Sequence, residues 1–275
     1  MKNSSDSPSA DFVLYSDGGS DGGRCAAGAC IVEDCHTGKR WHLGVSLGTG
    51  TNNEAEISSS LLGFAFMLTL GATGKKRAVR WVADSEYVLK SATGYISNWQ
   101  RNGWKTADKK PVKNQGLWRS YLLLSEHFTI RSEHVRGHTG HVENEACDEA
   151  VQWVKLRGQD LFGARAVVET AEIHTTAGTH QWAIVDGSRW MDAVRTEHPD
   201  EATMLWFVTA LQNVHQTLEG ASTPLRAAEN TEQVLLAPAV RKLKEAYQAA
   251  EKAAAKSDRA RTLAKDLRSL LVDYE

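Results

Sequence analysis

The sequence predicts an α/β protein: a mixed five-stranded sheet flanked by helices, followed by an added, mainly α-helical C-terminal region. Strand-like apolar runs alternate with helical patterns through residues 11–163. Three of these runs precede the first helix, so we expect antiparallel strands followed by a crossover. Beyond them, apolar residues recur mainly at helical spacing. We therefore predict a disordered tail at 1–10, a catalytic domain at 11–163 and a helical extension at 164–275.

Length and composition describe a soluble protein with room for more than one structural unit. The chain has 275 residues and a formal net charge of -2, which is longer than most single domains. Its four cysteines form no CxxC pair, and no secretory leader is apparent, so we expect reduced thiols and a cytoplasmic location. The longest apolar stretch, 61–70, is shorter than the roughly 20 residues that span a bilayer. We expect no membrane partner.

The first three strands form a meander. Residues 11–16 are apolar and β-favouring, and they stop at the Gly-rich turn 17–23. Two further runs, 27–32 and 40–47, are separated by the turn-forming segment 34–38. Antiparallel pairing of the three runs is the simplest arrangement that buries them.

Helices and strands then alternate, because the apolar period changes after residue 51. The expected elements are a helix from Asn52 capped by Asn53, a strand at 78–83, a short helix from Ser85, a helix at 114–127, a strand at 129–135, and a helix from about Asn144.

Four acidic residues lie beside predicted strand ends or helix starts: Asp17, Glu56, Asp84 and Asp148. Adjacent strand ends of an open sheet form a crevice, so acids far apart in sequence can meet there. Converging carboxylates bind hard divalent cations, which activate water and neutralise charge in phosphodiester hydrolysis. The alternative for any one of these acids is a solvated side chain or a helix N-terminal charge.

Five motifs around these acids occur in one order. They are YSDGG at Tyr15–Gly19, TNNEAE at Thr51–Glu56, ADSEYV at Ala83–Val88, WQRNGWKTADKKPVKN at Trp99–Asn114, and GHTGHVENEACD at Gly137–Asp148. Together they make residues 12–161 resemble the ribonuclease HI family.

This resemblance implies a ribonuclease H-like fold that cuts the RNA strand of RNA·DNA hybrids and leaves 5′-phosphate and 3′-hydroxyl ends. It implies two Mg²⁺ ions, for which Mn²⁺ can substitute, held by Asp17, Glu56, Asp84 and Asp148. The mobile catalytic histidine would be His138, in a Gly-flanked loop. An imidazole titrating near neutral pH can carry a proton there.

The resemblance also implies the residues that contact substrate. Recognition of RNA requires hydrogen bonds to the 2′-hydroxyl, and side-chain amides supply both a donor and an acceptor. Asn52 and Asn53 match that role, although simple helix capping is a compatible reading. The full substrate-binding set is Gly18, Thr51, Asn52, Asn53, Glu86, Tyr95, Trp99, Arg101, Trp104, Lys105, Lys109, Lys110 and Asn144.

A basic segment, residues 101–119, is similar to the family's basic handle. It contains six Lys or Arg residues against one acid, Asp108, and tryptophans are interleaved with the charges. Cations with aromatic supports suit a phosphate backbone, which binds largely without regard to sequence. We interpret the segment as a grip on the DNA strand, against the alternative of a solvated loop.

The sequence departs from the family pattern in three places. The loop after Asp17 is short and lacks the usual Asn-Pro. Glu86 replaces a common Gln and adds negative charge near the metal site. Glu54 precedes Glu56 by two residues, and the register with Asn52 favours Glu56 as the ligand.

The resemblance does not cover the residues after 163. Residues 180–190 can form a hairpin with its turn at 186–187, 198–219 has helical spacing, and residues from 225 onward suggest long amphipathic helices. Such helices need a surface to cover, so they could pack on the nuclease, on a second copy or on a protein partner.

Several alternatives remain open at this point. A zinc site could use His138, His141 and Cys147, although the spacing is irregular and no fourth ligand is evident. The chain could be another nuclease of the same superfamily, such as a resolvase or an integrase-like nuclease. It could also be a non-cutting hybrid-binding protein, or the nuclease subunit of a larger assembly docked through its C-terminal helices.

Overall fold

The computed structural model describes residues 10–70, 75–137, 139–161 and 168–195. The elements in chain order are β1 (Phe12–Ser20), β2 (Ala26–Asp34), β3 (Arg40–Gly48), α1 (Asn52–Thr69), β4 (Arg77–Ala83), α2 (Glu86–Lys90), the π-helical turn η1 (Ser91–Tyr95), α3 (Ile96–Arg101), α4 (Gln115–Ser125), β5 (Phe128–His134), α5 (Val142–Leu161), β6 (Val168–Thr175), β7 (Gly178–Asp186) and α6 (Ser188–Val194).

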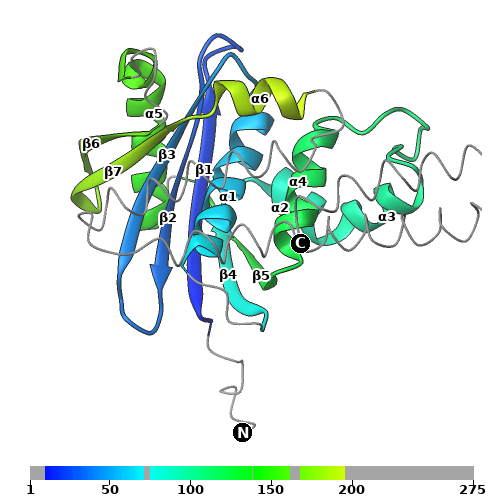
Figure 1. Ribbon diagram of the computed structural model, residues 1–275, viewed down its shortest axis with the longest axis horizontal. Coiled ribbons are helices and arrows are strands. Elements are labelled where there is room, and N and C mark those ends of the chain that lie inside the picture. Colours follow the sequence, from blue (N-terminus) through cyan, green and yellow to red (C-terminus); the bar gives the residue numbers. More distant parts are fainter. Residues whose placement is uncertain (1–9, 71–74, 138, 162–167, 196–275) are drawn as a thin grey trace, which may run out of the picture. The chain divides into compact units, whose positions relative to one another are not determined.

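The strands form one mixed sheet in the order β5-β4-β1-β2-β3-β7-β6 (Figure 1). The pairs β1–β2, β2–β3 and β6–β7 are antiparallel, and the pairs β1–β4, β4–β5 and β3–β7 are parallel. The predicted class, a mixed sheet flanked by helices, is confirmed. The sheet has two more strands than the five we predicted, because β7 adds to the free edge of β3.

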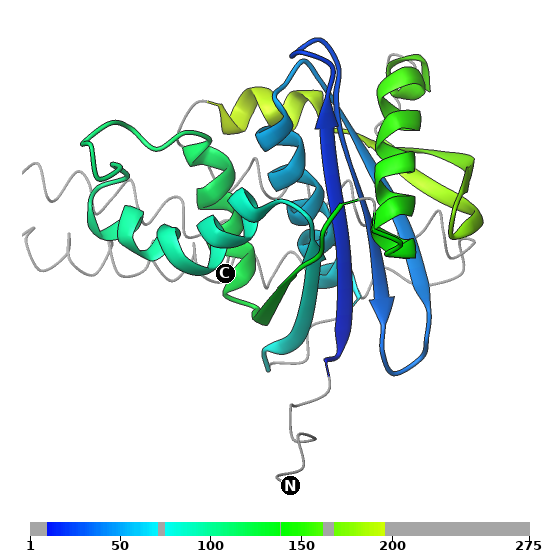
Figure 2. The ribbon, with the colours of Figure 1, turned by 180° about the vertical axis from the view of Figure 1, so that it is seen from behind.

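Helices α1 and α5 cover opposite faces of the sheet (Figure 2). Alternate residues of a strand point to opposite faces, and β1 shows this directly. Val13 and Tyr15 belong to the apolar core beneath α5, which also contains Val151. Leu14 lies on the other face, where a Cβ on Gly63 of α1 would meet its side chain at 2.3 Å. Asp17 continues the series on the α5 face.

Strand β1 is longer than predicted. It pairs with β2 as far as Ser20, so Asp17 lies within the strand and not at its end. The glycines after Asp17 are opposite Gly28 and Ala27. Continued backbone pairing of these small residues outweighs their turn-forming tendency.

Helix α1 begins at Asn52 as predicted, but its N-cap is Thr51 and not Asn53. Thr51 has the extended backbone of a cap, and its hydroxyl accepts the Glu54 N–H while the Glu54 carboxylate accepts the Thr51 N–H. This reciprocal pair is a capping box. Asn53 is already inside the helix, which leaves its side chain available for other contacts.

Two further segments differ from the sequence prediction. Residues 86–101 form α2, η1 and α3 in succession, whereas we predicted only a short helix from Ser85. The C-terminal hairpin turns at 176–177, between β6 and β7, and not at Asp186. The Asp186 carboxylate instead accepts hydrogen bonds from the N–H and hydroxyl of Ser188, which starts α6.

The described part of the predicted helical extension, 168–195, therefore consists of two strands and one short helix. The tail predicted at 1–10 and the helices predicted beyond residue 195 lie almost wholly outside the described residues. Within the described part of the chain, no helix is both long and apolar enough to cross a membrane.

Candidate active site

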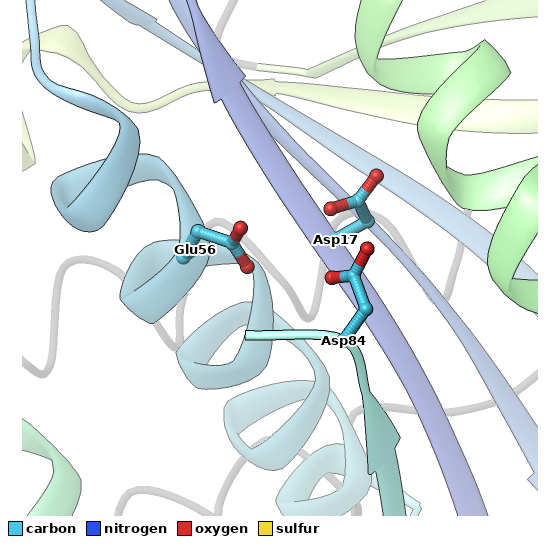
Figure 3. A group of neighbouring side chains, drawn as sticks. All are labelled: Asp17, Glu56 and Asp84. Carbon is cyan, nitrogen blue, oxygen red and sulfur yellow. The ribbon is translucent and has the colours of Figure 1, made fainter. Parts of the chain in front are cut away.

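Three of the four predicted acids meet where the second half of β1 lies beside the carboxyl end of β4. One carboxylate oxygen from each of Asp17, Glu56 and Asp84 lies within 4.8 Å of the others. Figure 3 shows Asp17 on β1, Asp84 just after β4 and Glu56 on α1, with their carboxylates pointing toward one another. We call these three residues the acidic cluster. Among the described residues it is the group with metal-binding geometry.

Strand register brings the two aspartates together. β1 and β4 are parallel neighbours in which Tyr15 is opposite Val82. Asp17 and Asp84 each follow two residues later in the chain. Parallel neighbours carry equivalent positions to the same edge of the sheet, so the pairing alone makes the two carboxylates adjacent.

Gly18 allows Glu56 to join them. A Cβ at Gly18 would lie 2.3 Å from the carbonyl carbon of Ala55 and 2.3 Å from the backbone nitrogen of Glu56. Any side chain here would push the start of α1 away from β1. The Gly18 N–H also donates to Asp17 Oδ1 at 2.8 Å, which orients that carboxylate. Gly18 thus builds the cluster through its backbone, whether or not it also touches substrate.

Crowding of the acids raises their pKa values. Burial, and then the charge of Asp84, raise the pKa of Asp17 from 3.8 to about 7. Burial, followed by the charges of Asp17 and Asp84, raises the pKa of Glu56 from 4.5 to about 9. Desolvated like charges oppose ionisation. A bound cation would supply the opposite charge that this arrangement lacks.

The donor set fits a hard divalent cation. All three side chains offer carboxylate oxygen, the ligand type preferred by Mg²⁺, Mn²⁺ and Ca²⁺, with no soft sulfur ligand among them. Raised pKa values also indicate a functional site, since such shifts are concentrated where charge is needed for chemistry. The residues present therefore fit the predicted metal.

Asp148 lies near the acidic cluster but is not one of its three members. It is half-buried on α5, and its Oδ1 accepts a hydrogen bond from Gln152 Nε2 at 3.2 Å. Its charge contributes to the raised pKa of Asp17. Asp148 therefore acts on the charge of the acidic cluster, while the metal-binding geometry is formed by the other three acids.

His138 lies outside the described residues, but the residues before it touch the site. A Cβ on Gly137 would be 2.8 Å from Asp84 Oδ2, so this loop passes directly beside the carboxylate. His134, which we did not predict as a site residue, has its Nε2 atom 3.0 Å from the backbone oxygen of Asp84. This hydrogen bond helps to hold the end of β5 against the end of β4.

The predicted hybrid-contacting residues at the start of α1 are accessible, since Thr51, Asn52 and Asn53 are all exposed. The predicted contact residue on α5, Asn144, is instead buried. It is 3% exposed, and its Oδ1 has no hydrogen-bond partner among the described residues. Glu54 is bound to Thr51 and to Arg195, while Glu56 faces the acidic cluster.

The basic handle is an ordered projection built from α3, α4 and the loop between them. The loop is closed by backbone bonds, including Trp104 N–H to Trp99 oxygen at 2.7 Å and Val112 N–H to Trp104 oxygen at 3.0 Å. Tyr95 is 50% exposed, and the centroid of its ring lies 6.0 Å from that of Trp99. The predicted cations Arg101, Lys105, Lys109 and Lys110 are all exposed.

Two predicted contact residues have other partners in the structure. Trp104 is only 8% exposed and lies beneath the guanidinium of Arg119, 4.7 Å from its ring centroid, so it supports the handle from inside. Glu86 pairs with Lys90 one helical turn later, and this partner lowers the pKa of Glu86. Its extra negative charge is therefore partly compensated on the surface.

Sequence reasoning missed Lys155 near the acidic cluster. Lys155 Nζ is 2.7 Å from Asp21 Oδ1, its side chain is 7% exposed, and its charge acts to lower the pKa of Asp17. The signal was available, because Lys155 follows Asp148 by seven residues and so occupies the same face of α5.

The zinc alternative gains no support from the described residues. Cys147 is fully buried, its Sγ is 3.8 Å from the backbone oxygen of Tyr15, and burial raises the pKa of its thiol well above the ordinary value. A cysteine binds zinc as a thiolate, so this environment opposes coordination by Cys147. His141 packs against the ring of Tyr15 instead.

Fold and site together define an α/β protein with a carboxylate site that suits divalent cations, placed beside two neighbouring parallel strands of a mixed sheet. The RNase H family model matches residues 9–154, more than half of the chain, and the chain belongs to the RNase H family. The predicted resemblance is confirmed, and it counts against a resolvase or an integrase-like nuclease.

The chain is also similar to curated relatives and to solved structures. Over 99 residues the chain is 44% identical to Ribonuclease H of Enterobacter sp. (strain 638) and 43% identical to Ribonuclease H of Erwinia tasmaniensis. Each alignment covers 36% of this chain and 60% of the relative, so the chain spans about three-fifths of the length of these curated relatives. It is also similar to the crystal structure of LC9-RNase H1, a type 1 RNase H with the type 2 active-site motif, with 22% identity, a TM-score of 0.48, and coverage of 70% of this chain and 87% of that chain.

Proposed function

We propose that the protein is an endoribonuclease that hydrolyses the RNA strand of RNA·DNA hybrids and leaves 5′-phosphate and 3′-hydroxyl ends. The observation that carries the proposal is the acidic cluster, whose oxygens lie within 4.8 Å of one another in a chain of the RNase H family. Phosphodiester hydrolysis requires a concentration of positive charge at the reacting phosphate. The cluster is built to hold that charge.

Asp17, Glu56, Asp84 and Asp148 would hold two Mg²⁺ ions, with Mn²⁺ as a substitute. When bound, such a pair supplies an activated water and neutralises charge on the phosphate. The carboxylates fix where that charge lies relative to the sheet edge, and Gly18 keeps the contributions of β1 and α1 in register. His138 would move a proton at the departing oxygen or assist product release.

Selection of the hybrid would depend on two neighbouring surfaces. Asn52 and Asn53 are exposed on the same helix as Glu56, where their amides can bond the 2′-hydroxyl of the RNA strand. The exposed cations of the handle, with Tyr95 beside them, suit the DNA backbone. Distinct surfaces for the two strands are what a hybrid-specific enzyme requires.

A substrate panel tests the proposal. Purified full-length protein would be incubated with an end-labelled RNA·DNA hybrid and with matched RNA·RNA and DNA·DNA duplexes, in Mg²⁺, Mn²⁺ or EDTA. We expect cleavage only of the RNA in the hybrid, and none in EDTA. Equal cleavage of either pure duplex, or cleavage that persists in EDTA, would rule out the proposed specificity or metal dependence. Binding of hybrid by folded protein without any cleavage would favour the non-cutting alternative.

The handle yields a separate prediction about salt. Changing Lys109 and Lys110 together to Gln removes two exposed cations, so we expect weaker hybrid binding at every sequence. We also expect a plot of log Kd against log salt concentration to lose about one unit of slope per phosphate contact. Fluorescence anisotropy across a salt series measures both effects.

The matched control changes another exposed lysine pair, Lys75 and Lys76, to Gln at the opposite end of β4 from Asp84. An equal loss of slope in both double variants would mean that net charge, and not the handle, determines binding.

Two expectations from the sequence stay predictions. They are a protein partner or self-association through the C-terminal helices, and a cytoplasmic location.

A further inference from the structure

Helix α6 lies beyond residue 154, where the family match ends, yet it packs on the substrate-facing start of α1. Trp190, Met191 and Val194 of α6 are at most 2% exposed. The Ser58 hydroxyl of α1 is 3.6 Å from Met191 Sδ. Figure 1 and Figure 2 both show α6 running beside the start of α1. This buried apolar face makes α6 part of the catalytic unit.

The end of α6 also touches the handle. A Cβ on Gly116, in the first turn of α4, would lie 1.8 Å from the backbone oxygen of Val194. Only a glycine permits this approach. Because α4 forms one side of the handle, α6 contacts both elements that we expect to meet the hybrid.

Arg195, directly after α6, connects this helix to the capping box of α1. Its Nη2 donates to the backbone oxygen of Thr49 at 2.6 Å, and its Nε donates to Glu54 Oε1 at 3.0 Å. The other oxygen of Glu54, Oε2, accepts the Thr51 N–H at 2.7 Å. A continuous series of bonds therefore runs from Arg195 through Glu54 to Thr51.

The position of Glu54 explains why its bond to Arg195 matters for substrate binding. Glu54 directly follows Asn53, and its carboxylate is bound to Thr51, so its negative charge lies beside residues that we expect to contact a polyanionic hybrid. Unpaired, that charge would repel phosphate, and its carboxylate would be free to leave the cap. Arg195 supplies the opposite charge and a second anchor at Thr49.

We infer that Arg195 is a positioning residue, which holds the first turn of α1 in its substrate-binding conformation and neutralises Glu54 beside the hybrid. The inference rests on the proposed function, and it gives the chain beyond residue 154 a part in substrate binding. The side chain of Arg195 is bonded to Glu54 and Thr49 and not to the acidic cluster, so Arg195 would act on substrate through Glu54.

Steady-state kinetics of the full-length protein test the inference. For Arg195→Ala we expect KM for the hybrid to rise about five- to tenfold, within the range for loss of an ordinary intramolecular hydrogen bond, and kcat to change less than about twofold. Arg195→Lys, which keeps the charge but not the two-pronged geometry, should restore part of the loss. Arg80→Ala is the matched control, because it breaks another Arg–Glu pair, with Glu133, and the side chain of Arg80 is about as exposed as that of Arg195.

A double-variant comparison separates action through Glu54 from direct contact with substrate. Glu54→Gln removes the charge but keeps a side chain that suits a capping box. If Arg195 acts through Glu54, adding Arg195→Ala to Glu54→Gln should raise KM much less than it does alone. An equal rise in both backgrounds would overturn the inference, as would an unchanged KM in folded Arg195→Ala.

A measurement without substrate keeps this inference distinct from the proposed function. Amide hydrogen exchange at Thr51 and Glu54 should be faster in Arg195→Ala than in wild type or Arg80→Ala, because both N–H groups are bonded within the capping box. Faster exchange in a protein that cuts no hybrid would support the positioning role of Arg195 and refute the nuclease proposal. Unchanged exchange would refute the positioning role of Arg195, whatever the activity.

Discussion

Replacing Asp84 with Asn is expected to lower the rate of RNA-strand cleavage by about 10³-fold or more. The substitution keeps the shape of the side chain but removes one of the three carboxylates whose oxygens lie within 4.8 Å of one another. Metal-ion stabilisation of a phosphoryl transition state is worth several kcal/mol, and each ~1.4 kcal/mol is tenfold in rate. Single-turnover cleavage of the hybrid at saturating protein concentration measures the chemical step directly.

Asp34→Asn is the matched control for this substitution. Asp34 lies at the other end of the sheet, where it is opposite Phe12, and its Oδ1 accepts the N–H groups of His36 and Thr37. An asparagine oxygen can accept the same bonds, so activity should stay within about twofold of wild type. If Asp84→Asn also retained its activity, the acidic cluster would not be the catalytic metal site.

Replacing Asp17 with Asn is expected to stabilise the metal-free protein while abolishing activity. Burial and neighbouring acids raise the pKa of Asp17 from 3.8 to about 7, and each pKa unit corresponds to about 1.4 kcal/mol. Removal of this disfavoured charge should raise the free energy of unfolding by about 2–4 kcal/mol above pH 7. For a chain of this size the melting temperature should rise by roughly 5–10 °C.

The pH dependence gives the sign of the effect. Because folding raises the pKa of Asp17, the folded protein binds a proton more tightly than the unfolded chain between pH about 4 and 7. Stability of the metal-free wild type should therefore fall as pH rises through that window. The advantage of Asp17→Asn should be absent near pH 4 and complete above pH about 7. Thermal unfolding followed by circular dichroism in EDTA, at several pH values, measures this difference.

Asp34→Asn again serves as the control, and its melting temperature should show no comparable gain at high pH. Mg²⁺ should raise the melting temperature of wild type much more than that of Asp17→Asn, because the ion binds the folded state through this carboxylate. A lower melting temperature for Asp17→Asn in EDTA at pH 8 would show that the charge of Asp17 is not a source of strain.

The sequence was sufficient to predict the acidic residues and most of the elements that carry them. Apolar runs that end beside Asp17 and Asp84, and a helical period that starts at Asn52, are local patterns with local causes. The motifs around them indicated the family, which the match to residues 9–154 confirmed. Exposure of Asn52 and Asn53 also follows from the cap, since the residues at a helix start face solvent unless another element covers them.

Tertiary pairing decided what local patterns could not. The two extra strands exist because the edge of β3 accepts β7 as a parallel neighbour, and backbone pairing with a distant strand has no local signature. The closeness of Glu56 to Asp17 depends on the space left by Gly18. Tryptophan is a residue type that often contacts nucleic acid, yet the backbone bonds of the loop place the ring of Trp104 beneath Arg119.

The amino-acid sequence by itself determined the family, the fold class and the identity of the acids, because these depend on residue type and short-range spacing. Only the tertiary structure decided that Arg195, 141 positions after Glu54 in the chain, bonds to it. It likewise decided that the predicted helical extension begins with two strands of the catalytic sheet. Contacts of that kind arise from burial and complementary charge between distant segments, and no periodicity in the sequence encodes which segments meet.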